Sequence, residues 1–263
     1  MSPAHRIHSS FDMNTHHTRP LLAAALLLGG ILTWTTPASA VTWIAGADLA
    51  ANEQPDGPQE LNSINPTVPQ WSYGARSTIL GTSFTPFTPA EHGNDISGYT
   101  NFDGFSANGQ IIVNAGAAPI ITNNGAGPLD PLASHDIYVH PGVSMNPVVR
   151  WTAPVTGTFS VSAFWDDNDP YGGDGGSGNV VVNGVSVFGV TYANTGGATM
   201  PTTNFNLNAG DFVDFVLGRN ATVAHDGTSF NATIIGMAAP EPSRALLLAL
   251  AAASLMLRRR RRS

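Results

Sequence analysis

The densest group of side chains that could do chemistry is an acidic stretch in the second half of the chain. Four aspartates fall close together among asparagine and glycine: Asp166, Asp167, Asp169 and Asp174. Calcium binds about six to eight hard oxygens, and a flexible loop of Asp, Asn and Gly can supply them. The EF-hand spacing is absent, because no glutamate stands at its last liganding position. Two interpretations stay open: a Ca²⁺ site, or a surface turn whose side chains cap backbone N–H groups.

Two aromatic residues beside the acidic stretch could bind a sugar. Trp165 directly precedes the stretch and Tyr171 lies within it. An aromatic ring can bury the apolar C–H face of a sugar, while nearby Asp and Asn side chains bind hydroxyl groups. Trp165 also fits the alternating pattern of a strand, which favours a place in the core. Both residues are therefore candidate ligand contacts, with core packing as the alternative for Trp165.

The chain lacks the residue patterns of several enzyme classes. It has no cysteine, which excludes thiolate nucleophiles, disulfides and cysteine-based zinc sites. The motif Gly-x-Ser-x-Gly is also absent. Glycoside hydrolysis needs two carboxylates about 5 to 10 Å apart in a cleft, which a sequence cannot place. We expect a protein that is not an enzyme, and a secreted polysaccharide hydrolase is the alternative.

Short strands separated by turns must position these residues. Apolar residues alternate along Thr158–Trp165, so that every second residue from Phe159 shares one face. The pair Asn183-Gly184 predicts a type I′ hairpin, because both central residues of that turn need a positive φ. Similar runs predict strands at Ser77–Thr85, Gln110–Asn114, Pro119–Thr122, Asp136–His140, Val148–Ala153, Asn179–Val182, Val185–Tyr192, Asn204–Leu207, Asp211–Leu217 and Ser229–Ile235.

About ten short strands without helical periodicity predict an all-β fold, a jelly-roll-like β-sandwich. A closed barrel of about eight strands is the alternative. Four prolines argue against a continuous helix in residues 41–70, which we expect to be a loop-rich entry segment after a first strand at Val41–Ile44. Residues 71–237 are assigned to one β-sandwich domain, because no linker or charged block divides them.

Charge is unevenly distributed along the chain. There is no lysine, and only Arg76, Arg150 and Arg219 among the arginines lie between residues 41 and 240. Most acidic residues lie in that segment, so it is more acidic than the net charge of −7 for the whole chain indicates. Such a surface repels phosphate backbones and attracts cations. We therefore expect no nucleic-acid partner.

Residues 1–40 have the layout of a secretory signal peptide. A basic region that contains Arg19 precedes the apolar run Leu21–Leu32, and an Ala-x-Ala sequence follows it. Signal peptidase reads this order, so Ala38 and Ala40 are the expected recognition residues, with cleavage after Ala40. The apolar run is too short to span the hydrocarbon core, which is about 30 Å thick.

Residues 238–263 have three parts in a fixed order. Pro240, Glu241 and Pro242 come first, and a short apolar helix is expected at Ala245–Leu257. Arginines beside an apolar segment stay on the cytoplasmic side of a membrane. The five arginines after the apolar stretch are therefore expected to stop transfer of the chain across the membrane: Arg258, Arg259, Arg260, Arg261 and Arg262. A helix of this length covers about 20 Å, which favours transient association with the inner membrane over a simple tail anchor.

This tail resembles the PEP-CTERM sorting signal of Gram-negative bacteria, because motif, apolar run and arginine cluster occur together over Pro240–Ser263. The resemblance implies that a membrane enzyme, exosortase, recognises Pro240, Glu241 and Pro242 and processes the protein. It also implies an association with exopolysaccharide and the biofilm matrix.

A second resemblance covers His140–Ile235. The segments Trp151-Thr152-Ala153-Pro154 and Val182-Asn183-Gly184 are among those that carry it. This part looks like β-sandwich modules of other PEP-CTERM exported proteins, and it is loosely similar to carbohydrate-binding modules. The resemblance implies a fold rather than a reaction.

These features together predict a non-catalytic protein that is exported to the cell surface or extracellular matrix and contributes weak glycan binding or adhesion. The expected partners are signal peptidase, an exosortase-type sorting enzyme and exopolysaccharide. A purely structural matrix subunit is a further alternative.

Overall fold

The structure, a computed structural model, describes residues 40–51, 68–88, 92–93, 102–107, 109–119 and 130–237 of the chain. All of them belong to one unit, residues 39–239. The leader before Ala40, the Pro-Glu-Pro motif, the apolar stretch and the arginine run lie outside the described residues, as does most of the strand predicted at Pro119–Thr122. In the described part, no helix is long and apolar enough to cross a membrane.

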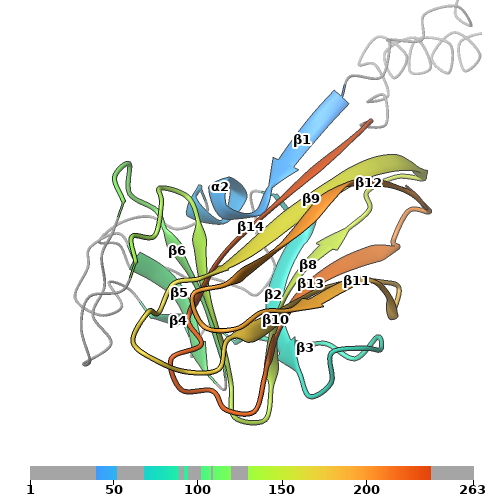
Figure 1. Ribbon diagram of the computed structural model, residues 1–263. Coiled ribbons are helices and arrows are strands. Elements are labelled where there is room, and N and C mark those ends of the chain that lie inside the picture. The colour runs from blue at the N-terminus through green and yellow to red at the C-terminus, as the bar shows by residue number, and fades with distance from the viewer. Residues whose placement is uncertain are drawn as a thin grey trace, which may run out of the picture. The chain divides into compact units, whose positions relative to one another are not determined.

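Two antiparallel sheets make up the described structure (Figure 1). The eight-stranded sheet, here sheet A, has the order β12-β9-β14-β7-β6-β5-β4, and β1 pairs with the last part of β14. Its strands are β1 (Ala40–Ile44), β4 (His92–Gly93), β5 (Phe102–Ala107), β6 (Gly109–Asn114), β7 (Ile137–Pro141), β9 (Gly157–Asp167), β12 (Gly197–Leu207) and β14 (Thr228–Met237). The six-stranded sheet, here sheet B, has the order β11-β10-β13-β8-β2-β3. Its strands are β2 (Trp71–Arg76), β3 (Thr85–Pro86), β8 (Asn146–Thr152), β10 (Gly176–Val182), β11 (Val185–Thr191) and β13 (Phe212–Arg219).

Strands β7 to β14 are arranged as a jelly roll. In sheet A the late strand β14 lies between the earlier strands β7 and β9, and in sheet B the late strand β13 lies between β8 and β10. This return of late strands to positions beside early ones is the double Greek key of a jelly roll. The structure therefore confirms the predicted jelly-roll-like β-sandwich. The described strands form two separate sheets rather than the alternative closed barrel.

Alternating apolar residues fill the space between the two sheets. The face of β9 predicted to point inward is buried from Phe159 to Trp165. Trp151 of β8 meets Trp43 of β1 and Phe159 edge-on, with ring centroids 5.2 and 5.0 Å apart. Large aromatic rings of both sheets thus build the core, as is expected where two inner faces interdigitate.

A short helix, α2 (Ala45–Ala50), follows β1 and was not predicted from the sequence. Six residues are too few to show a helical period, and tertiary contacts hold the helix instead. Leu49 is fully buried, and the Asp48 carboxylate accepts hydrogen bonds from the Ile44 N–H and the Trp71 indole N–H at 3.0 and 2.7 Å. The first residues after Ala40 are therefore joined to the sandwich.

The strand predicted at Ser77–Thr85 is wrong. Strand β2 ends at Arg76, and bends follow until β3 begins at Thr85. The Arg76 guanidinium donates hydrogen bonds to the main-chain oxygens of Ile79 and Gly81, which curls this segment back on itself. Local alternation could not reveal this, because Arg76 is held by a strand far away in the sequence.

The hairpin predicted at Asn183-Gly184 is confirmed. The φ angles are 49° at Asn183 and 87° at Gly184, and Val182 pairs with Val185 across the turn. Both values lie in the left-handed region that a type I′ turn requires.

Candidate functional site

The acidic stretch forms a loop in which carboxylates cap backbone N–H groups. Asp167 accepts hydrogen bonds from the N–H groups of Asp169 and Thr195 at 3.0 and 2.9 Å. Asp169 accepts one from the Tyr171 N–H at 3.2 Å, and its other oxygen lies 3.1 Å from Nδ1 of His225. These are the self-capping contacts of Asp-rich turns.

The other two aspartates of the stretch point elsewhere. Asp174 accepts hydrogen bonds from the N–H groups of Ala221 and Thr222, at 2.8 and 3.2 Å. Asp166 is exposed and still lies on β9. No three His, Asp or Glu side chains of the described residues are placed to hold a metal ion. The four predicted carboxylates do not converge, so the turn-capping interpretation describes this loop and they do not form a shared Ca²⁺ site.

Asp226 is a buried carboxylate beside this loop that the sequence did not single out. Its residue is 1% exposed, and neither carboxylate oxygen has a hydrogen-bond partner of normal geometry among the described residues. Burial and the charge of Asp174 raise the pKa of Asp226 to about 6. The residue lies far along the chain from Asp174, and no local motif marks it.

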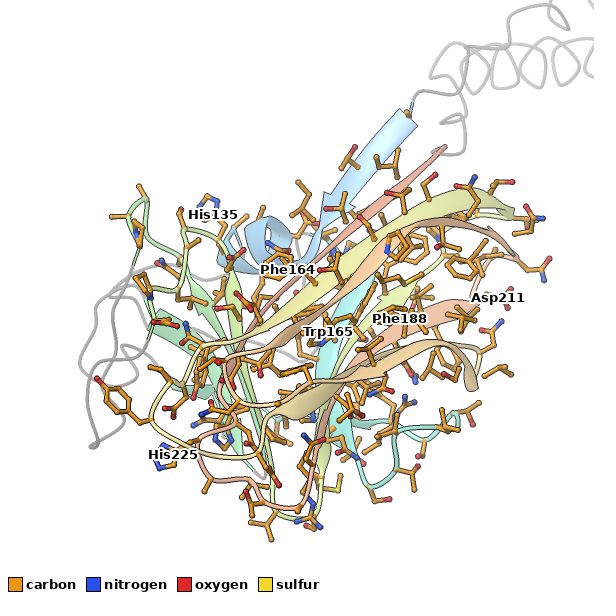
Figure 2. All side chains as sticks on the ribbon, in the orientation of Figure 1. His135, Phe164, Trp165, Phe188, Asp211 and His225 are labelled. Atoms are coloured by element: carbon orange, nitrogen blue, oxygen red, sulfur yellow. The ribbon has the colours of Figure 1, made fainter. Side chains whose placement is uncertain are left out.

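Trp165 is a core residue, so the prediction of a sugar contact there is wrong. It is 2% exposed and stacks on Phe188 of β11 at 6.2 Å between ring centroids (Figure 2). The ring of Phe230 also packs against Trp165, with ring centroids 5.4 Å apart. The alternating pattern of β9 therefore predicts the position of Trp165 correctly. A side chain that points inward from a central strand leaves no ring face for a ligand. Tyr171, 45% exposed, remains a candidate contact.

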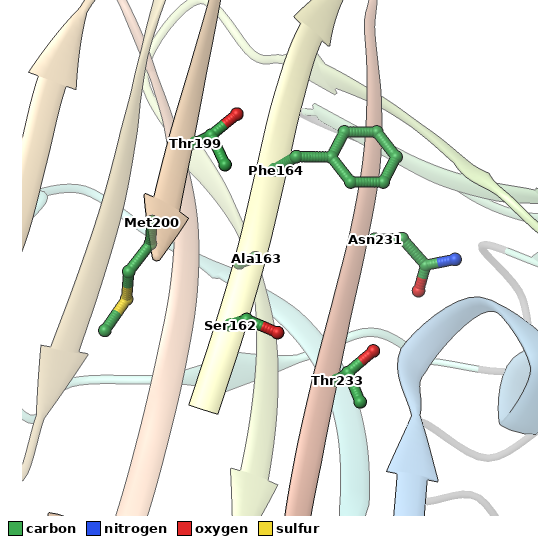
Figure 3. Close-up of a pocket in the computed structure, with 7 residues that line it drawn as sticks. All are labelled: Ser162, Ala163, Phe164, Thr199, Met200, Asn231 and Thr233. Atoms are coloured by element: carbon green, nitrogen blue, oxygen red, sulfur yellow. The ribbon is translucent and has the colours of Figure 1, made fainter. Parts of the chain in front are cut away.

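A pocket lies on the outer face of sheet A, where β12, β9 and β14 run side by side (Figure 3). Its volume is about 250 Å³. Register places Phe164 between Thr199 and Asn231, and Ser162 opposite Thr233. The lining residues are Ser162, Ala163, Phe164, Thr199, Met200, Asn231 and Thr233. This pocket therefore offers one aromatic ring among hydroxyl and amide groups.

Fixed polar contacts shape this face of sheet A. Asn231 receives hydrogen bonds from the N–H groups of Gly46 and Ala232 at 3.0 and 2.9 Å, and its amide donates to Asp136 at 3.0 Å. Further along β9, Ser160 donates to Asn204 of β12 at 2.6 Å. These hydrogen bonds thus hold the side chains on the outer face of sheet A in place without a ligand. The side chains therefore lose less conformational entropy when a ligand binds.

A second pocket, of about 290 Å³, lies beside His140. Its lining residues are Gly109, Gln110, His140, Pro141, Gly142, Val143 and Val223. Burial lowers the pKa of His140, which favours its neutral form. Among the described residues that line either pocket there is no Asp or Glu. Neither pocket offers the carboxylate pair of a glycoside hydrolase.

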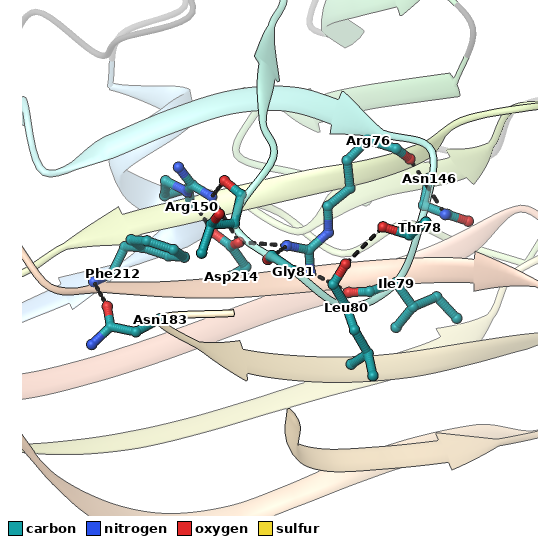
Figure 4. A network of polar contacts seen from close by, with 11 residues as sticks. Arg76, Thr78, Ile79, Leu80, Gly81, Asn146, Arg150, Asn183, Phe212 and Asp214 are labelled. Atoms are coloured by element: carbon teal, nitrogen blue, oxygen red, sulfur yellow. Dashed lines mark hydrogen bonds and ion pairs between the residues drawn. The ribbon is translucent and has the colours of Figure 1, made fainter. Parts of the chain in front are cut away.

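A buried ion-pair network lies on sheet B (Figure 4). Asp214 of β13 is fully buried and accepts hydrogen bonds from Arg76 of β2 at 2.9 Å and from Arg150 of β8 at 2.6 and 2.9 Å. The guanidinium of Arg150 lies 3.9 Å from the ring centroid of Phe212 and 4.4 Å from that of Phe84. The network joins three strands to the segment after β2, so we assign it to stability rather than to ligand binding.

No family model matches the chain, and no curated protein matches it. Among solved structures, a family 35 carbohydrate binding module from Clostridium thermocellum is 20% identical, covering 44% of this chain and 86% of that chain with a TM-score of 0.27. A CBM35 from Cellvibrio japonicus Abf62 is 18% identical, covering 48% of this chain and 91% of that chain with a TM-score of 0.26. Pika GITRL is 18% identical, covering 35% of this chain and 79% of that chain, also with a TM-score of 0.26. At such TM-scores these similarities carry no argument about what this chain binds.

Proposed function

We propose that this protein is an exported, non-catalytic β-sandwich that binds a neutral polysaccharide on the outer face of sheet A. The observation that carries the proposal is the position of Phe164 within the pocket on β12, β9 and β14, surrounded by hydroxyl groups. A pyranose presents an apolar C–H face and a rim of hydroxyls. An aromatic platform beside neutral donors and acceptors complements both.

The absence of charged side chains in the pocket favours a neutral sugar over a charged one. None of the seven described residues that line it is Asp, Glu, Lys, Arg or His. The acidic character of the segment around the pocket opposes an anionic chain such as a polyuronate. A neutral glycan therefore fits the pocket better than an acidic one. The lack of a carboxylate pair in either pocket favours binding over hydrolysis.

Export is the second half of the proposal. The leader with Ala38 and Ala40 delivers the chain to signal peptidase, and the tail with Pro240, Glu241 and Pro242 delivers it to an exosortase-type enzyme. Cleavage after Ala40 would remove one terminal pair of β1, Ala40 with Met237, and leave the pairs from Val41 to Ile44. Processing at that site is thus compatible with the sandwich. The protein would then meet exopolysaccharide at the cell surface or in the matrix.

Replacing Phe164 with alanine is expected to weaken binding to a neutral polysaccharide about tenfold, because the platform under the sugar ring is lost. Affinity electrophoresis in gels that contain native exopolysaccharide or neutral plant glycans measures this as lost retardation. Ile235→Ala is the matched control: Ile235 is an exposed apolar side chain on β14, the strand beside the β9 strand of Phe164, but it does not line the pocket. Retention of the Phe164→Ala protein equal to that of Ile235→Ala would refute the site. No retardation of the unmodified protein by any polysaccharide would favour a purely structural matrix subunit.

Export is tested separately, by fractionating cells that produce the full chain and sequencing the N-terminus of the product. The expected result is a surface or extracellular protein that begins at Val41. An intact chain in the cytosol would contradict the export half of the proposal and leave the binding half to be judged by the gels.

A further inference from the structure

Strand β11 is an exposed edge of sheet B (Figure 1). Among the described strands it pairs with β10 alone, so every second main-chain N–H and C=O group of β11 points away from the sheet. Six of its seven residues are exposed, and Phe188, whose ring stacks on Trp165, is half-buried. Val185, Val187 and Val190 are 66, 42 and 40% exposed. The edge therefore offers main-chain hydrogen-bonding groups beside exposed apolar side chains.

Other edge strands carry protection against pairing that β11 lacks. β3 and β4, at the far edges of sheets B and A, have two residues each. β12, the other edge of sheet A, contains Pro201, and its register with β9 shifts between Met200 and Thr203. Short edge strands, prolines, charges and bulges are the usual devices that prevent edge pairing. β11 contains neither proline nor a charged residue, and a bulge that leaves Val187 unmatched on the β10 side is its only such device.

The stretch of chain that contains β11 has no charged side chains. No Asp, Glu, Lys, Arg or His stands between Asp174 and Asp211, and this stretch supplies β10, β11 and β12. β11 and β12, the edges of the two sheets, also contact each other. The rest of residues 41–240 is acidic, so two copies of the protein repel one another over much of their surface. The uncharged stretch is therefore where two copies can approach with the least repulsion.

We propose that β11 pairs with β11 of a second copy of this chain, antiparallel and about a two-fold axis, so that two B sheets join into one. Antiparallel pairing of identical strands fits this symmetry, because each strand donates to its partner the same hydrogen bonds that it receives. A basic partner would find its counter-charges on the acidic part of the protein, whereas a second copy meets no like charge on β11. No residue that lines the pocket around Phe164 lies on β11, so the proposal does not depend on glycan binding.

The size of the contact sets its expected strength. A strand of seven residues is about 24 Å long. A standard protein interface uses about 20–30 residues from each partner, far more than one strand supplies. We therefore expect a reversible dimer with a Kd on the order of 100 µM.

Sedimentation of the purified full chain, from about 10 µM to about 1 mM protein, tests for this dimer. The unmodified protein is expected to pass from monomer to dimer over this range. Val187→Lys is expected to weaken the dimer at least about tenfold, because two lysines then oppose each other near the axis. Val143→Lys is the matched control: Val143 is 67% exposed and lies outside β11, so the same added charge is expected to change the Kd less than about twofold.

Disulfide cross-linking tests the two-fold pairing independently of the lysine variants. The chain has no cysteine, so a single introduced cysteine can form a disulfide only with another copy. A residue n positions from the axis lies about 7n Å along the strands from its own copy, and a disulfide requires Cα atoms within about 7 Å. Cross-linking is therefore expected to be fastest near one point of β11 and to fall toward both ends. The variants are Val185→Cys, Ser186→Cys, Val187→Cys, Val190→Cys and Thr191→Cys, with Val143→Cys as the control.

Four results would overturn the proposal. The first is a protein that stays monomeric at every concentration. The second is a dimer that survives in Val187→Lys, since it would form through another surface. The third is equal weakening by Val143→Lys, which would show an effect of net charge rather than of the strand edge. The fourth is cross-linking at the same rate along all of β11 and at Val143, as random collision produces.

Discussion

Replacing Asp214 with alanine is expected to lower the free energy of unfolding by about 3–5 kcal/mol, because it leaves two arginines without their shared counter-ion. Asp214 and Arg76 have fully buried side chains, and the side chain of Arg150 is 14% exposed. The charges cannot turn to solvent without moving β13 or the segment after β2. Urea unfolding followed by tryptophan fluorescence measures the effect, and the slope with denaturant shows whether the variant is folded at the start.

Asp211→Ala is the control for this prediction. Asp211 lies three residues earlier, is half-buried and caps the N–H of Asn208 at 2.7 Å, so its loss is expected to cost about 1 kcal/mol. A loss for Asp214→Ala no larger than that for Asp211→Ala would contradict the assignment. Such a result would mean that the network contributes no more to the free energy of unfolding than an exposed ion pair does, about 0–1 kcal/mol.

Replacing Trp165 with alanine is expected to cost about 3–5 kcal/mol of unfolding free energy, because the ring fills the core between the two sheets. Its ring contacts Phe188 and Phe230, and it packs so closely on Gly178 that a Cβ atom there would lie 2.5 Å from it. Thermal and urea unfolding of the variant measure the loss.

Tyr171→Ala is the contrasting variant, since Tyr171 lies in the neighbouring loop and is 45% exposed. Its removal is expected to change stability by no more than about 0.5 kcal/mol. Trp165→Ala that keeps full stability but loses glycan retention would contradict the core assignment and restore Trp165 as a ligand contact.

The parts of the fold that depend on neighbouring residues were predictable from the sequence. The alternation in β9 and the Asn183-Gly184 turn are local, since each depends on residues two positions apart or adjacent. Helix α2 could not be predicted, because it is held by Trp71 and by a buried face rather than by its own period. The bend after Arg76 depends on Asp214, which binds the Arg76 guanidinium from 138 residues further along the chain.

The candidate sites were even less predictable from the sequence than the fold, because their residues come from distant parts of the chain. Alternation places Phe164 outward, but its neighbours Thr199 and Asn231 come from strands that only the jelly-roll topology brings beside β9. Aspartates are densest at residues 166–174, yet the buried carboxylate whose oxygens have no hydrogen-bond partner of normal geometry is Asp226. Conversely, hydrogen bonds to nearby N–H groups satisfy the aspartates that looked most like ligands. The sequence shows where charged residues are dense, but only the folded structure shows which of them are engaged by hydrogen bonds.

Chemical-shift mapping of the labelled protein with a short neutral oligosaccharide would locate the glycan site residue by residue. We expect the largest shifts on the outer face of sheet A, at Ser162, Phe164, Thr199 and Thr233. Shifts confined to the loop around Tyr171, or no shifts with any neutral oligosaccharide at millimolar concentration, would contradict it.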